Sequence, residues 1–146
     1  MSIAARVSVE IARPVSEVWS FFENTANLPL WVPGFVDFEI TSPPPHGAGA
    51  TYTMKIKEGR HVNEYQGKNL EWEPRRRVRE YMCGGRFKDG ERVTAAYDFI
   101  DLGDRCRLDY QSEFHTKRML ALLLKLPFWL YCRSMIRALK RAAESA

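Results

Sequence analysis

The sequence predicts a single α+β domain, residues 1–146, in which a bent antiparallel sheet of seven strands wraps around a long C-terminal helix, with two short helices between strands 1 and 2. Three observations carry this prediction. One strand and two short helices come first, six alternating apolar and polar segments separated by turn signals follow, and Thr116 to Ala146 has apolar residues at helical spacing. A length of 146 residues suits one domain. A helix this long needs a surface for its apolar face, and the sheet is the surface available.

The first third of the chain predicts a strand followed by two short helices. Apolar and polar residues alternate from Arg6 to Ala12, which indicates a strand with one buried side. Pro14 suits the first turn of a helix that ends at Glu23, because a proline at that position loses no helical hydrogen bond. Between Asn24 and Pro33 the prolines leave room for one short helix at most.

Six further strands are predicted from Val36 onward. The strand Val36 to Ile40 ends at the proline-rich stretch 43–47, and three turn signals then predict three hairpins. The hairpins pair Ile56 with His61, Met54 with Asn63, and Tyr52 with Tyr65; Met82 with Tyr97, and Glu80 with Phe99; and Phe99 with Leu108, Tyr97 with Tyr110, Ala95 with Ser112, and Val93 with Phe114. Partners across a strand pair share a face, so one face of the sheet is apolar and aromatic and the other is polar. Gly67 and the pair Gly84-Gly85 are expected to mark bulges.

Pro127 interrupts the predicted C-terminal helix. A proline inside a helix removes a hydrogen bond and clashes with the preceding turn, so we expect a kinked or split helix, with pieces Thr116 to Leu126 and Phe128 to Ser145. The alternative is a helix that begins only at Pro127, after a separate apolar turn.

The basic character of the protein belongs to this last segment. The net charge is +4, but residues 116–146 carry seven Lys and Arg against one acidic residue, which makes that segment +6 and the rest −2. A solvated basic face explains such a segment, and so does contact with an anionic membrane surface. The run Leu120 to Cys132 is too short to span a bilayer, which requires about 20 apolar residues. Nucleic acid is not expected as a partner, because no basic patch is interleaved with exposed aromatic residues.

No cofactor or metal site is expected. Cys83, Cys106 and Cys132 are far apart and lack a C-x-x-C pair, and neither His46 nor His115 has a second ligand at metal spacing. The N-terminus has no apolar run of signal-peptide length, so a cytoplasmic location is expected. The sequence leaves the oligomeric state open.

Several segments resemble a known superfamily. They are IARPVSEVWSFFENTANLPLWVPG, GAGATYTMKI, LEWEPRRRVREY and the final helix. Together they resemble the START-like helix-grip superfamily and, within it, the polyketide cyclase/dehydrase and lipid-transport (SRPBCC) family. The resemblance covers nearly the whole chain, and its motifs mark the fold rather than a catalytic centre. It implies a cavity between sheet and helix that binds apolar molecules such as lipids, polyketides, sterols or isoprenoids.

The expected function is binding, with or without transport, of a hydrophobic small molecule or lipid in that cavity. The residues expected to contact the ligand are Trp31, Phe35, Tyr52, Met54, Asn63, Tyr65, Met82, Tyr97, Phe99, Tyr110, Ser112, Phe114, Leu122, Leu126 and Trp129. Aromatic rings with polar tips can line an apolar pocket and orient a ligand's few polar groups, although the same side chains can also simply fill a core.

Two alternative functions remain open at this point. The first is a polyketide cyclase/dehydrase-type enzyme, for which His61 and Tyr110 are the catalytic candidates because they can exchange a proton or polarise a carbonyl. The second is a membrane- or protein-associated accessory module that acts through the basic C-terminal helix.

Overall fold

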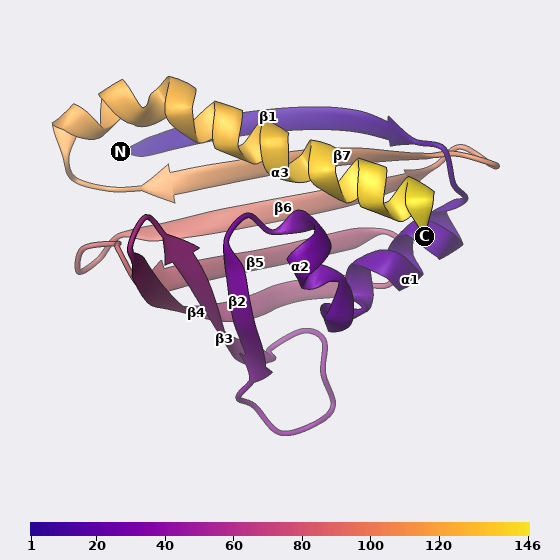
Figure 1. The fold of residues 1–146 in the computed structure, drawn as a ribbon, viewed down its shortest axis with the longest axis horizontal. Coiled ribbons are helices and arrows are strands. Elements are labelled where there is room, and N and C mark those ends of the chain that lie inside the picture. The colour runs from indigo at the N-terminus through magenta and orange to yellow at the C-terminus, as the bar shows by residue number, and fades with distance from the viewer.

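A computed structural model describes all 146 residues and shows one curved antiparallel sheet that grips a C-terminal helix (Figure 1). The elements are β1 (Ser2–Ile11), α1 (Val15–Glu23), the 3₁₀ turn η1 (Thr25–Asn27), α2 (Leu28–Trp31), β2 (Phe35–Ile40), β3 (Thr51–Glu58), β4 (His61–Glu73), β5 (Arg77–Gly84), β6 (Arg92–Asp101), β7 (Cys106–His115), the 3₁₀ helix η2 (Met119–Leu124) and α3 (Lys125–Ser145). The predicted fold class is confirmed, including the two short helices after the first strand.

The strand order places the first two strands at opposite edges of the sheet. The order is β1-β7-β6-β5-β4-β3-β2, and every neighbouring pair is antiparallel. Strands β2 to β7 therefore form a meander, while α1 and α2 carry the chain from one edge to the other (Figure 1). The concave side of the sheet is closed partly by these helices and partly by α3.

Helix α3 packs along β1 through one apolar stripe. The stripe consists of Cys132, Met135, Ile136, Leu139 and Ala143, whose spacing of three, four and seven residues keeps them on one side of the helix. By length and composition the helical segment 119–145 could also cross a membrane, a test that the core helix of a folded domain passes as well.

The C-terminal end of α3 is fixed to the loop that follows β1. The Glu144 carboxylate accepts hydrogen bonds from the Ala12 backbone N–H at 2.8 Å and from Lys140 Nζ at 2.7 Å. Arg13 donates to the Glu144 carbonyl oxygen. At the other end of α3, residues 125–131 include no buried side chain, and Trp129 Nε1 donates to the Arg6 carbonyl oxygen at 3.2 Å.

Two of the three predicted hairpin registers are wrong by an even number of residues. The β6–β7 register is confirmed, with Tyr97 opposite Tyr110 and Ala95 opposite Ser112. Between β3 and β4 the turn residues are Gly59 and Arg60, so Met54 faces Tyr65 instead of Asn63. Between β5 and β6 a longer loop replaces the two-residue turn, and Met82 faces Val93. Because side chains alternate with a period of two, an even shift leaves each residue on its predicted face.

Gly67 does not mark a bulge. The register shift in β4 lies at Leu70, between Asn69 and Glu71. A Cβ on Gly67 would lie 2.2 Å from Cζ of Tyr52, so the glycine lets the Tyr52 ring lie directly over the β4 backbone. The residue is required for the position of an inward-facing tyrosine rather than for a change of strand direction.

Pro127 lies in the first turn of α3, and the helix begins two residues before it. The expected split at Pro127 is therefore displaced, and the arrangement is closer to the alternative of a first-turn proline after a separate turn. That separate turn, η2, is a 3₁₀ helix rather than part of an α-helix.

Candidate ligand pocket

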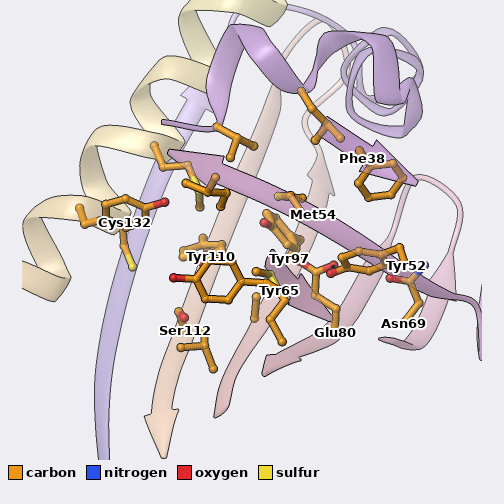
Figure 2. Close-up of a pocket in the computed structure, with 18 of the residues that line it drawn as sticks. Phe38, Tyr52, Met54, Tyr65, Asn69, Glu80, Tyr97, Tyr110, Ser112 and Cys132 are labelled. Carbon is orange, nitrogen blue, oxygen red and sulfur yellow. Dashed lines mark hydrogen bonds between the residues drawn. The ribbon is translucent and has the colours of Figure 1, made fainter. Parts of the chain in front are cut away.

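A cavity of about 1000 Å³ lies between the concave face of the sheet and α3. Its walls come from the inward-facing side chains of the sheet, from the helices α1 and α2, and from the N-terminal half of α3 (Figure 2). Most of the lining residues are hydrophobic, and the volume is at the upper end of what small-molecule sites enclose. The side chains therefore do not fill the space that the fold encloses.

Aromatic rings form one wall of the cavity and pack against one another, which holds each ring in position. The ring of Phe22 lies 4.9 Å from that of Tyr97 and 5.9 Å from that of Trp31, measured between centroids. Phe38 packs against Tyr52 at 5.1 Å on the β2–β3 side. The centroid distances are those at which aromatic pairs stabilise each other, so this wall is preformed.

Glu80 on β5 is a carboxyl side chain that lines the cavity. Its carboxylate Oε2 accepts a hydrogen bond from the Tyr52 hydroxyl at 2.9 Å (Figure 2). No Lys, Arg or His lies within ion-pair distance of it. Burial raises the pKa of Glu80, and the hydrogen bond from Tyr52 only partly opposes that effect. Burial therefore favours the protonated form of this carboxyl group more than water does, and a protonated carboxyl can both donate and accept a hydrogen bond.

A second polar group lies across the cavity from Glu80. Tyr110 on β7 points toward Ser112 and toward Cys132 of α3 (Figure 2). Ser112 Oγ donates to the Thr94 carbonyl oxygen at 2.9 Å, and the ring of Tyr97 lies 4.9 Å from that of Tyr110. Burial raises the pKa of Tyr97 and Tyr110, and it raises the pKa of the Cys132 thiol to about 11. All three groups are therefore neutral at physiological pH.

A third polar group is at the end of the cavity nearest the start of α3. Glu58 accepts hydrogen bonds from the Tyr65 hydroxyl and, at 2.9 Å, from Asn63 Nδ2, and its other oxygen lies 3.7 Å from Arg86 Nη1. Burial is the main cause of the raised pKa of Tyr65. Glu58, Tyr65 and Arg86 all line the cavity. Exposed lining residues such as Arg86, Lys88, Leu124 and Tyr131 show that the cavity opens here.

Nine of the predicted ligand contacts line the cavity. They are Trp31, Tyr52, Met54, Tyr65, Met82, Tyr97, Tyr110, Ser112 and Phe114. Trp31 is also notable because its buried Nε1–H has no hydrogen-bond partner.

Six other predicted contacts do not line the cavity. Phe35 packs against the core from β2, and Phe99 is buried beneath Trp19 of α1. Asn63 donates a hydrogen bond to Glu58, which lines the cavity, whereas Asn63 itself does not. Leu122, Leu126 and Trp129 point outward and are exposed. The catalytic candidate His61 is exposed beside the β3–β4 turn, outside the cavity, whereas Tyr110 lies within it.

Glu80 is the main residue that the sequence analysis missed. Acidic residues on strands are most often exposed and ion-paired, as is Glu71 of β4, whose Oε2 lies 3.8 Å from Arg77 Nη1. Glu80 is the exception because it shares the inward face of β5 with Met82, two residues later. The sequence did contain a signal for this orientation, because the predicted hairpin pairs Glu80 with Phe99, an inward-facing residue, and cross-strand partners share a face. Other lining residues that were missed are Phe22, Phe38, Asn69, Trp72, Phe87, Phe128, Tyr131 and Met135.

The protein has no group of three or more His, Cys, Asp or Glu side chains that could hold a metal ion. The polar groups that line the cavity are carboxyl, phenol, hydroxyl, thiol and amide groups, together with His46, Arg86, Lys88 and Arg118, among mostly apolar side chains.

Solved structures show the same fold. Ara h 8.0201 superposes with a TM-score of 0.81 at 13% sequence identity and covers 100% of both chains. A protein from Thermus thermophilus gives 0.74 at 16% identity, over 97% of both chains. Norcoclaurine synthase from Thalictrum flavum, in complex with dopamine and hydroxybenzaldehyde, gives 0.71 at 20% identity and covers 97% of this chain and 86% of the synthase. At these identities the likeness establishes the fold alone.

The sequence itself matches a family model across almost its whole length. No curated protein matches the chain. The family model described as polyketide cyclase / dehydrase and lipid transport matches residues 2–144. This match shows that the chain belongs to the polyketide cyclase/dehydrase and lipid-transport family.

Proposed function

We propose that the protein binds a hydrophobic small molecule or lipid that carries one hydroxyl or carbonyl group. The observation that supports this most directly is Glu80, a carboxyl group without a cation on the wall of a large apolar cavity. The apolar body of the ligand lies along the aromatic wall, and its oxygen is hydrogen-bonded by Glu80 and Tyr52. Such a ligand repays part of the cost of keeping the carboxyl group away from water.

The volume and the polar groups set the class of ligand. A cavity of about 1000 Å³ suits a sterol, an isoprenoid or a polyketide rather than a single-ring compound. No cation lies within ion-pair distance of Glu80, and burial raises the pKa of the neighbouring Tyr52 and Tyr97, so this part of the cavity favours an uncharged group of the ligand.

Binding can be tested with a matched pair of isoprenoids, farnesol and the hydrocarbon farnesene. Each is titrated against the wild type while the intrinsic tryptophan fluorescence is measured, because Trp31 and Trp72 line the cavity. We expect farnesol to bind about tenfold more tightly than farnesene, which is the usual effect of one hydrogen bond in a desolvated site.

The variant Glu80→Leu should lose this preference and keep its affinity for farnesene. Glu73→Leu, an exposed change of the same kind at the end of β4, is the control and should behave as the wild type. Failure of both compounds to bind, or an unchanged preference in Glu80→Leu, would contradict the proposal.

The same residue favours one second function, acid-catalysed dehydration of a β-hydroxy ketone. The protonated form of Glu80, which burial favours, donates its proton to the hydroxyl group as the C–O bond breaks. The resulting carboxylate takes the proton from the neighbouring carbon, so that water and an enone are formed. The probe is 4-hydroxy-4-phenyl-2-butanone, whose conversion to benzylideneacetone is followed by absorbance. Catalysis should disappear in Glu80→Gln, and an equal rate in that variant would exclude this role for Glu80.

A further inference from the structure

The segment that leads into α3 exposes an unusual number of large apolar side chains. They are Met119, Leu120, Leu122, Leu123, Leu124, Leu126, Trp129 and Leu130, which together we call the apolar ridge. Leu120 and Leu123 are 80% and 77% exposed. Monomeric folded proteins rarely expose a continuous apolar surface of this extent, and those that do use it for binding.

The 3₁₀ geometry of η2 explains why Leu120, Leu122 and Leu123 point away from the protein. With three residues per turn, every third side chain falls on the same side of the helix. Arg118, Ala121 and Leu124 occupy the side that faces the protein: Ala121 packs on Ile3 and Phe114, and the other two line the cavity. The intervening leucines are therefore directed away from the sheet, and the exposure follows from the backbone.

Unpaired positive charges surround the ridge. Lys117, Lys125 and Arg137 are exposed and form no ion pair, and the Arg133 guanidinium lies 5.6 Å from the centroid of the Trp129 ring. No acidic residue occurs between Glu113 and Glu144. Exposed leucines with a tryptophan at their border and cations beside them are typical of a segment that lies in the interface of an anionic bilayer.

A second copy of the protein fits this surface less well. Two ridges that packed face to face would bring together two segments that each carry seven cationic residues and one acidic residue. Like charges opposed across an interface are destabilising, whereas an anionic lipid surface has the complementary sign.

The ridge is also continuous with the cavity. Leu124, Pro127, Phe128 and Tyr131 line the cavity, although Leu124 and Tyr131 are also exposed. In Figure 1, η2 and the first turn of α3 lie together at one end of the molecule, above the tip of β7. A lipid surface in contact with the ridge would therefore cover the opening that Leu124 and Tyr131 border.

We propose that the apolar ridge docks on an anionic lipid bilayer and that the cavity exchanges its ligand directly with that bilayer. The second part rests on the proposed function, and the docking itself does not. The exposed leucines insert among the acyl chains, Lys117 and Lys125 contact the lipid headgroups, and the ligand moves between bilayer and cavity without crossing water.

The test is co-sedimentation with vesicles of phosphatidylcholine, with and without phosphatidylglycerol. We expect the wild type to bind vesicles that contain phosphatidylglycerol and to be released by added salt. The double variant Leu120→Glu/Leu123→Glu should bind about a hundredfold more weakly, roughly tenfold for each leucine removed from the lipid contact. Lys117→Gln/Lys125→Gln should lose the preference for phosphatidylglycerol.

The matched control is Leu70→Glu/Leu102→Glu, which makes the same change at two exposed leucines outside the ridge. It should bind vesicles nearly as well as the wild type, and thermal unfolding should show that both double variants are folded. Equal binding by the ridge and control variants would overturn the inference, and so would failure of the wild type to bind. A concentration-dependent dimer that only the ridge variant loses would also overturn it, because a second copy would then cover the ridge.

Titration with farnesol in the absence of vesicles separates the two proposals. Farnesol binding by the wild type without vesicle binding would leave the proposed function standing and refute the docking. Vesicle binding without farnesol binding would refute the proposed function alone. If both hold, transfer of farnesol from vesicles should be slower for the ridge variant, whose affinity for farnesol in solution should be unchanged.

Discussion

Glu80 and Glu91 are both acidic residues with little access to water, yet their surroundings shift their pKa values in opposite directions. Glu91 accepts hydrogen bonds from Arg118 Nε at 2.6 Å, from the Lys88 N–H at 2.8 Å and from the Thr116 hydroxyl. Glu80 has only the hydroxyl of Tyr52. Arg118 and the hydrogen bonds lower the pKa of Glu91 to about 2, whereas burial raises the pKa of Glu80.

The comparison shows that Glu91 has a structural role, whereas Glu80 is free to contact a ligand. Glu91 uses its oxygens to hold the β5–β6 loop against the start of η2, so it has little capacity left for a ligand. Glu80 has unused hydrogen-bonding capacity and a surface on the cavity. A satisfied buried carboxylate stabilises a fold, and an unsatisfied one indicates a binding site.

Removing the cation of the structural acid should have the largest effect on stability. In Arg118→Met, Glu91 keeps only two neutral donors, and we expect a loss of about 2 kcal/mol in the free energy of unfolding, because solvent weakens the partly exposed pair. Chemical denaturation measures this loss. Lys117→Met, which removes an adjacent cation without an ion pair, should change stability by less than about 0.5 kcal/mol.

The second-largest expected effect is a loss of folding stability at low pH that depends on Glu91 and not on Glu80. The folded-state pKa of Glu91 is below its unfolded value, so its contribution is fully present above about pH 4.5 and is lost as the pH falls toward 2. We expect a loss of about 1 to 2 kcal/mol over that range, because Arg118 is partly exposed and solvent weakens the pair. Glu91→Gln should remove this part of the pH dependence, and an unchanged acid profile in that variant would contradict the assignment.

The contribution of Glu80 to stability should depend on pH in the opposite direction. Its folded-state pKa is above the unfolded value, so its contribution is present at low pH and is lost as the pH rises through the folded pKa. Glu80→Gln should therefore flatten the decline in stability above about pH 4.5. Denaturation midpoints measured at pH 4 and pH 7 would test this, and a steeper decline in the variant would be evidence against a raised pKa.

The smallest expected effect comes from removing the Tyr52 hydroxyl group, which joins β3 to Glu80. Tyr52→Phe removes one hydrogen bond and should cost about 1 kcal/mol or less. The pKa of Glu80 should rise further, because the hydrogen bond from Tyr52 favours the charged form. Carbon-13 NMR titration of the Glu80 carboxyl group measures this shift, and a lowered pKa would contradict the geometry.

The sequence predicted the fold and the faces of the strands better than positions along them. Tyr52, Met54 and Tyr65 face inward despite a wrong register, because the error was even and the alternation of side chains survives it. Phe99 has the right face but lies under α1 rather than in the cavity. Alternation specifies a side of the sheet, whereas the location of the cavity depends on where α1 and α3 cover that side.

The segment before Pro127 was predicted less well because its period differs from that of an α-helix. Leu122 and Leu126 were expected to face the ligand on a spacing of 3.6 residues, but η2 turns every three residues and directs Ala121 and Leu124 inward instead. Nothing in the sequence of leucines distinguishes the two periods. The only local signal was the proline itself.

Helix α3 is attached more firmly at its C-terminal end than at its N-terminal end. Glu144 and the buried stripe that ends at Ala143 fix its far end to β1, whereas its first turns lie over an open space and are held to β1 by the Trp129 hydrogen bond. We expect amide hydrogen exchange to be fastest in the first two turns of α3, which bury no side chain, and to slow when a ligand fills the space beneath them.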